Sequence, residues 1–326
     1  MDPEIVIREA TVADGPLCAK IERQSPLVMG DRSLTIDRGD DYFAAARLME
    51  APTVLIAEVD GVPAGVMCGA PHAALIGGTP RRMLYVHHAR ILPSFQGGGV
   101  GLLLARTLAT RYEGQIDSQY WYISPGNANS QSFTRRAPNR WSIRPAMVGI
   151  DTAARSGAPA GRPATAADAA AIARLINLAH EDEEMFVPYT AESLRQRVER
   201  APGQYGWERV WTTGHAVVGA WPEGERISLW TSVGGAPPME SRGAAVLDFG
   251  YERGHEAELV GLLRAWCGWL APRGLAELSV FSSPGTRHWE LLSSVGEHTE
   301  FDFWTPSLPE PPGVEHHGLY VDHAYF

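Results

Sequence analysis

The sequence is almost free of lysine, and this shortage excludes two kinds of chemistry. Among its 28 lysines and arginines, Lys20 is the only lysine. A Walker-type phosphate loop needs a lysine directly after its glycines, and a pyridoxal enzyme needs a lysine for its Schiff base. Lys20 stands in no such motif, so we expect neither chemistry.

Cysteine and basic charge are scarce as well. The three cysteines, Cys18, Cys68 and Cys267, lie far apart and form no CxxC pair. Such an odd set of thiols favours a reducing, cytoplasmic location. The net charge of −10 argues against nucleic acid or an anionic membrane as partner. No apolar run approaches the roughly 20 residues of a membrane span, and the acidic start is unlike a signal peptide.

What the sequence does contain is an internal repeat. The 326 residues, 44% hydrophobic and 20% charged, leave room for two globular domains. Three motifs of the first half return in the same order in the second: 8–14 at 162–168, 100–103 at 260–263, and 124–126 at 283–285. A small-residue stretch lies between the copies. We therefore predict domains at 1–151 and 164–326, joined by a linker at 152–163.

Hydrophobic alternation and turn signals predict the same order of elements in both halves. In the first half we expect a helix at 99–112 and strands at 5–7, 54–59, 62–68, 83–91 and 119–123. In the second half we expect strands near Val210, Val217, Val246 and Leu278 and at 318–326. The predicted fold class is α+β, with two tandem domains. Each domain is a mostly antiparallel mixed sheet flanked by helices.

A glycine-rich turn, QGGGVG at 96–101, separates a predicted strand from a predicted helix. Glycine costs roughly 1 kcal/mol against alanine inside a helix, so four glycines here indicate a need for bare backbone. The N–H groups and dipole of a helix N-terminus attract anions. A dinucleotide-binding turn would follow the first strand, whereas this one follows the fourth. The remaining alternative is a turn that binds no ligand.

This motif resembles the Q/R-x-x-G-x-G/A signature of the GNAT superfamily of acyl-CoA N-acyltransferases. Residues 89–93 are similar to the strand end that precedes the signature in that family, and 127–130 to its N-x-x-S segment. The resemblance implies a GNAT-like fold, acetyl-CoA as cofactor and no metal. It implies cofactor contacts from Ile91, Gln96, Gly97, Gly98, Gly99, Val100, Gly101, Asn127 and Asn129.

Acyl transfer to an amine needs a base, because an ammonium with a pKa near 10 must first lose a proton. By the period of two along a strand, Tyr85, His87, Ala89 and Ile91 share one face, and His88 lies on the other. His87 is our candidate base or water relay, with a packed histidine as the alternative. The arylalkylamine acetyltransferases of the family have histidine at the place of His87 and a second one where this chain has Tyr85, so the sequence departs from their two-histidine relay. Tyr85 is named beside His87 as a catalytic candidate.

The acid that protonates the leaving thiolate is harder to assign. In the family it is often a tyrosine seven residues after the first asparagine, a position that Thr134 occupies here. Tyr122 and Ser124 are possible substitutes. A nucleophilic Cys68 is conceivable, but a buried structural cysteine is the favoured interpretation.

The second half lacks the glycines. Aligned through the repeated motif, QGGG becomes EAEL at 256–259, and His87 becomes Leu247. Carboxylates at this place would repel a pyrophosphate. We therefore expect the second domain to be degenerate and non-catalytic.

The sequence thus predicts a cytoplasmic, monomeric tandem N-acetyltransferase that transfers acetyl from acetyl-CoA to an amine of a small molecule. Two alternatives stay open. One is a non-catalytic protein that binds or senses acyl-CoA, and the other is an N-acyltransferase acting on proteins or peptides.

Overall fold

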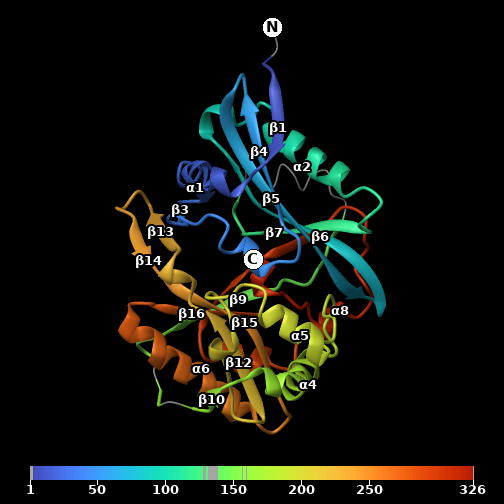
Figure 1. The fold of residues 1–326 in the computed structure, drawn as a ribbon, viewed down its shortest axis with the longest axis vertical. Coiled ribbons are helices and arrows are strands. Elements are labelled where there is room, and N and C mark those ends of the chain that lie inside the picture. The colour runs from blue at the N-terminus through green and yellow to red at the C-terminus, as the bar shows by residue number, and fades with distance from the viewer. Residues whose placement is uncertain (1–2, 128–129, 131–138, 156, 159, 326) are drawn as a thin grey trace.

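The protein is built on two large sheets, which lie one above the other with helices packed against them (Figure 1). The computed structural model describes residues 3–127, 130, 139–155, 157–158 and 160–325. In order across the first sheet, the strands are β1 (Ile5–Glu9), β4 (Thr53–Val59), β5 (Val62–Ile76), β6 (Thr79–Ile91), β7 (Ser118–Ile123), β18 (Asp302–Thr305) and β8 (Asn139–Arg140).

The second sheet repeats this arrangement. In order, its strands are β10 (Arg162–Pro163), β11 (Val210–Thr212), β12 (Ala216–Trp221), β15 (Gly243–Tyr251), β16 (Glu277–Ser282), β9 (Ala146–Asp151) and β17 (Glu297–Glu300). The fourth and fifth strands of each sheet, β6 with β7 and β15 with β16, are parallel, and the other pairs are antiparallel. The predicted α+β class with mostly antiparallel sheets is therefore confirmed.

Each half of the chain contributes one strand to the sheet of the other. Strand β18, from the second half, lies between β7 and β8 of the first. Strand β9, from the first half, lies between β16 and β17 of the second. Each sheet is thus completed by the other half. The boundaries predicted at 1–151 and 164–326 remain a prediction about folding units, because the sheets themselves exchange strands across them.

A smaller sheet also joins the halves. Its strands, in order, are β14 (Met239–Ser241), β13 (Ser228–Val233), β3 (Arg32–Asp37) and β2 (Leu27–Met29). The central pair, β13 with β3, runs from Ser228 opposite Asp37 to Val233 opposite Arg32. The backbone of the second half is therefore hydrogen-bonded to the segment just before Arg38, which contributes to the site below.

The helices cover the sheets through apolar faces. They are α1 (Gly15–Arg23), α2 (Val100–Arg111), α4 (Ala169–His180), α5 (Ala191–Val198), α6 (Glu256–Leu270), α7 (Trp289–Ser293) and α8 (Val314–His317). Leu104 and Leu108 of α2 pack with Leu84 of β6, and Leu262 of α6 packs with Val246 of β15. Among the described residues, no helix combines the length and the apolar character that crossing a membrane requires.

The start of each half shows the repeat at atomic detail. The Arg8 guanidinium donates to Asp14 at 2.8 Å, and the Thr11 backbone N–H donates to the same carboxylate at 2.8 Å. These hydrogen bonds hold the pKa of Asp14 well below its usual range. The corresponding contacts of the second half join Arg162, Thr165 and Asp168. Equivalent arginine, threonine and aspartate side chains therefore stabilise the equivalent turn in each half.

The end of the chain differs from the prediction. The strand predicted at 318–326 is wrong for its described part, since 318–325 contains an isolated bridge at Leu319 and a 3-10 turn, η8 (His323–Tyr325). The last strand of the second half is β18, in the other sheet, and β9 of the first half fills the place next to β16.

Candidate functional site

Two glycines in the left-handed region shape the turn between β6 and α2. Gly97 has φ of +82° and Gly99 has φ of +80°, where side chains are disfavoured. A Cβ atom added at either position would meet nothing within 4 Å. Glycine is therefore present for its backbone conformation, and the space above this turn is open.

The turn exposes the positive end of α2. The first α-helical hydrogen bond runs from the Leu103 N–H to the Gly99 carbonyl at 3.0 Å, so the N–H groups of the first turn have no partner within the helix. The Gln96 side chain donates to the Ile91 carbonyl at 3.1 Å and fastens the turn to the end of β6. These N–H groups and the helix dipole can hold an anion.

The parallel pairing beside this turn is short. Strands β6 and β7 pair only from Met83 opposite Ser118 to Tyr85 opposite Tyr120. The rest of β7 pairs on its other edge with β18. Within the described residues, the part of β6 from 86 to 91 has no pairing with β7, so its backbone groups on that edge remain for other partners.

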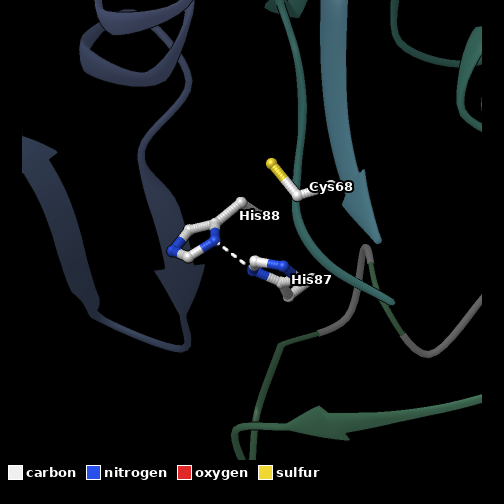
Figure 2. A group of neighbouring side chains, drawn as sticks. All are labelled: Cys68, His87 and His88. Atoms are coloured by element: carbon white, nitrogen blue, oxygen red, sulfur yellow. Dashed lines mark hydrogen bonds between the residues drawn. The ribbon is translucent and has the colours of Figure 1, made fainter. Parts of the chain in front are cut away.

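A bulge in β6 brings His87 and His88 together. His87 lies opposite Cys68 but Arg90 lies opposite Val66, and His88 has φ of +48°. The expectation that His88 lies on the other face is therefore wrong, because the extra residue breaks the alternation. The Nδ1 atoms of the two rings are in hydrogen-bond contact (Figure 2), and the ring centroids are 4.6 Å apart.

Tyr85, two residues before His87 in β6, packs against the His87 ring. The two rings are stacked, with centroids 4.7 Å apart and planes at 4°. Tyr85 also stacks on Tyr120 at 5.1 Å. Burial raises the pKa of the Tyr85 hydroxyl, which therefore stays protonated at neutral pH.

A buried charge network reaches His88 from α1 and from the end of β3. Arg38 donates to Glu22 at 2.6 Å and also contacts Nε2 of His88. Glu22 lies 3.9 Å from Arg90 through its other oxygen. The sequence analysis missed these residues, because only the fold brings α1, β3 and β6 together. No local signal marked them, because Arg38 and Glu22 both stand among other charged and polar residues.

The network fixes which ring nitrogens carry protons. Arg38 donates to Nε2 of His88, so the proton of His88 is on Nδ1 and is donated to Nδ1 of His87. The proton of His87 is therefore on Nε2, a buried atom with no hydrogen-bond partner among the described residues. Burial, with the charges of Arg38 and Arg90, lowers the pKa of His87 to about 3. His87 is thus a neutral ring that offers an N–H.

Cys68 lies beside both histidines (Figure 2), and the three side chains could in principle hold a metal, since their donor atoms lie within 4.8 Å of one another. Burial raises the pKa of the Cys68 thiol to about 12, so it is not a thiolate. Arg38 and Arg90 add positive charge nearby. A protonated thiol between two arginines disfavours both a bound cation and a nucleophilic role.

The other side of the gap holds Asn127 and Tyr122. Asn127 is buried, and its side-chain oxygen accepts from the Ser130 N–H at 3.1 Å, so it fixes the turn after β7. Burial raises the pKa of Tyr122 well above its usual value, and its ring lies 5.7 Å from that of Tyr85. Asn129 and Thr134 lie outside the described residues.

The equivalent place in the second half is occupied by carboxylates. Glu256 accepts from the Gly254 N–H at 3.2 Å and Glu258 lies 2.7 Å from Nδ1 of His255, at the start of α6. Backbone hydrogen bonds lower the pKa of Glu256, which is therefore charged. Leu247 is buried at the place equivalent to His87. This geometry offers no anion site of the first-half kind within the described residues.

A further titratable group was not found from the sequence. Glu223 begins the 3-10 turn η6 (Glu223–Glu225) after β12. Burial raises the pKa of Glu223 to about 7, with Arg38 opposing the rise and Glu277 adding to it. A carboxylate that titrates near neutrality and is coupled to Arg38 is a candidate acid or base.

The comparisons with known proteins agree with this geometry. Residues 25–137, which include the glycine turn, match the family model described as the acetyltransferase (GNAT) family. The match lies in the first half of the chain, and the second half forms a sheet of its own with a similar order of strands. The search of curated proteins gave no match.

Solved structures share the fold over nearly the whole chain. N-myristoyltransferase of Saccharomyces cerevisiae with bound myristoyl-CoA matches with a TM-score of 0.65 and 8% identity, covering 97% of this chain and 89% of that one. A GCN5-related N-acetyltransferase from Sphaerobacter thermophilus matches with a TM-score of 0.56 and 15% identity, covering 92% and 95%. At such identities the similarity shows the fold alone.

Proposed function

We propose that the chain transfers an acetyl group from acetyl-CoA to an amine of a small molecule. The observation that carries this proposal is the glycine turn, which opens α2 next to the unpaired edge of β6. The pyrophosphate of coenzyme A would bind the N–H groups of Gly97 to Gly101. The pantetheine arm would lie along residues 86–91, with Asn127 across from it.

The packing around Tyr85 supports a short acyl group. A cluster of four aromatic rings lies next to the point where the pairing of β6 and β7 ends, and it consists of Tyr85, Tyr120, Tyr122 and Phe303. Neighbouring ring centroids in it are less than 6 Å apart. A long acyl chain that entered between these strands would have to displace this cluster. Acetyl needs no such rearrangement.

The hydrogen-bond chain through Arg38 and His88 supports a donor role for His87. In the reaction the amine nitrogen attacks the thioester carbonyl carbon, its C–S bond breaks, and the amine loses one proton while the thiolate gains one. The Nε2–H of His87 would donate to the carbonyl oxygen as negative charge develops there. As a base, His87 would need the opposite tautomer and a pKa far above about 3.

Glu223 is a further candidate base, because the charge of Arg38, the residue that contacts His88, acts on it. Its pKa of about 7 lets it accept a proton from an ammonium near neutral pH. It comes from the second half, which would then contribute to catalysis without binding coenzyme A itself. The acid for the thiolate would be Tyr122 or the protonated Glu223.

A peptide N-terminus is the second candidate acceptor. The observation that favours it is the fold shared with N-myristoyltransferase over 97% of the chain. The net charge of −10 would also suit a basic peptide.

A thiol-release assay tests these proposals. Acetyl-CoA, a medium-chain and a long-chain acyl-CoA should each be supplied with a panel of small amines and with peptides carrying free or blocked N-termini. We expect release with acetyl-CoA and a small amine. Release only with free peptide N-termini would favour the second candidate, and tight binding without release for any amine would favour an acyl-CoA sensor.

A further inference from the structure

A buried group of metal-ligand side chains lies in the second half, on elements not used by the proposed site. His180 is the last residue of α4, Glu183 follows it by three residues, and His288 directly precedes α7. Their exposed fractions are 2%, 8% and 0%. Their donor atoms all lie within 4.8 Å of one another.

His180 contacts two acceptors with its two ring nitrogens. Nε2 lies 3.2 Å from the Phe249 carbonyl, and Nδ1 lies 2.7 Å from Oε1 of Glu183. A neutral imidazole has one N–H and cannot donate to both. If Nε2 donates to the carbonyl, the lone pair of Nδ1 faces the carboxylate, and a cation between them removes the repulsion. A histidine that ligates through one nitrogen and donates to a backbone carbonyl through the other is the usual arrangement in metal sites.

His288 is the second, independent observation. It is fully buried, and neither ring nitrogen has a hydrogen-bond partner among the described residues. An unpaired buried polar group costs about 1–3 kcal/mol, so such a ring calls for a partner. Its Nε2 lies 3.6 Å from Oε1 of Glu183.

The surroundings suit a small cation. Ligands about 2.0–2.1 Å from a tetrahedral zinc lie about 3.3 Å apart, and the separations of 2.7 Å and 3.6 Å bracket that value. The negative end of the α4 dipole is at His180. Aromatic rings surround the group and exclude water. The ring centroid of Phe249 lies 4.8 Å from that of His288, and the ring centroid of Tyr320 lies 4.9 Å from that of His180. The opposing charge is Arg287, whose guanidinium donates to the Tyr251 carbonyl at 2.7 Å.

We propose that His180, Glu183 and His288 bind one divalent transition-metal ion, for which zinc has the matching chemistry. Two imidazole nitrogens and one carboxylate oxygen form a ligand set that zinc accepts. The ion fastens the end of α4 to the segment before α7, which are about a hundred residues apart in the chain. Its role is structural, and it does not depend on the proposed function.

The test measures metal content and stability of the full chain without a histidine tag. Mass spectrometry of the metal should give one equivalent of zinc per chain after dialysis against zinc chloride. A strong chelator should remove it and lower the unfolding temperature by about 5 °C, as expected for an ion present well above its dissociation constant. Cobalt in its place should give visible absorption of a tetrahedral nitrogen–oxygen site.

Two variants locate the ion. His288→Ala and the nearly isosteric Glu183→Gln should each lose the equivalent of zinc, and Glu183→Gln covers the case in which His288→Ala does not fold. The matched control is His255→Ala, in the half-buried to exposed group of His215, His255 and Glu258, and this variant should keep its zinc. A wild-type chain that binds no zinc, a Glu183→Gln chain that keeps it, or loss in His255→Ala instead would each overturn the proposal.

Discussion

Replacing Gly99 by aspartate should weaken coenzyme A binding while leaving the fold in place. Gly99 is the residue before α2, with φ of +80° and open space where a side chain would project. Aspartate tolerates the left-handed region better than most residues and, at a helix N-terminus, favours the helix. The substitution therefore places a carboxylate where the pyrophosphate would bind, at little cost in stability.

The size of the effect follows from the charge. A carboxylate about 4 Å from a phosphate charge costs about 1 kcal/mol in water and about 4 kcal/mol at an effective dielectric of 20. The dissociation constant of acetyl-CoA should therefore rise by about fivefold to a thousandfold. Calorimetry with acetyl-CoA measures it, and a melting curve checks the fold.

Two controls separate charge from strain. Gly99→Asn has nearly the same size and backbone preference without the charge, so it should bind more tightly than Gly99→Asp by most of this factor. Gly114→Asp, at the far end of α2, has φ of +72° and equally open space, and should bind as wild type does. Unchanged binding in Gly99→Asp, or equal loss in Gly99→Asn and Gly99→Asp, would refute the reasoning.

Three further predictions concern titratable side chains. His87→Ala should lower kcat about 10²–10³-fold at every pH from 6 to 9, as loss of a hydrogen-bond donor does; recovery at high pH would instead indicate a base. Because the pKa of Glu223 is raised from 4.5 to about 7 in the fold, the stability it contributes is present below pH 4.5 and lost as the pH rises through 7. Glu223→Gln should therefore raise the free energy of unfolding by up to about 3 kcal/mol at pH 8 and leave it unchanged at pH 4. It should also remove any limb near pH 7 from the kcat/KM profile. A substitution that changes the free energy of unfolding equally at both pH values would contradict this. Asp14→Asn and Asp168→Asn should each lower the free energy of unfolding by about 1 kcal/mol at pH 7. Denaturant unfolding should show that this difference disappears as the pH falls below about 4. A lower free energy in only one of the two variants would mean that the two turns are not equivalent.

The sequence predicts those features that depend on neighbouring residues. The turn at 96–101 could be located because glycine with positive φ leaves a local signature, and the repeat because 8–14 and 162–168 make the same local contacts. The contact between the His87 and His88 side chains could not be predicted, because the bulge that allows it exists only when β6 pairs with β5. A period of two assumes regular pairing.

Features that depend on distant segments stayed hidden. The exchange of β9 and β18 leaves the order of motifs along the chain unchanged, so the repeat alone does not reveal it. Arg38 and Glu22 reach His88 and each other only in the folded chain. The pKa of Glu223 depends on burial that no sequence pattern encodes.

The most direct test of the account is the stoichiometry of acetyl-CoA binding to the full chain. The account has one coenzyme A site, at the glycine turn before α2, and carboxylates at the equivalent start of α6. Calorimetry should return one equivalent per chain for wild type and a dissociation constant at least about fivefold higher for Gly99→Asp. Two equivalents for wild type, or an unchanged dissociation constant in Gly99→Asp, would contradict it.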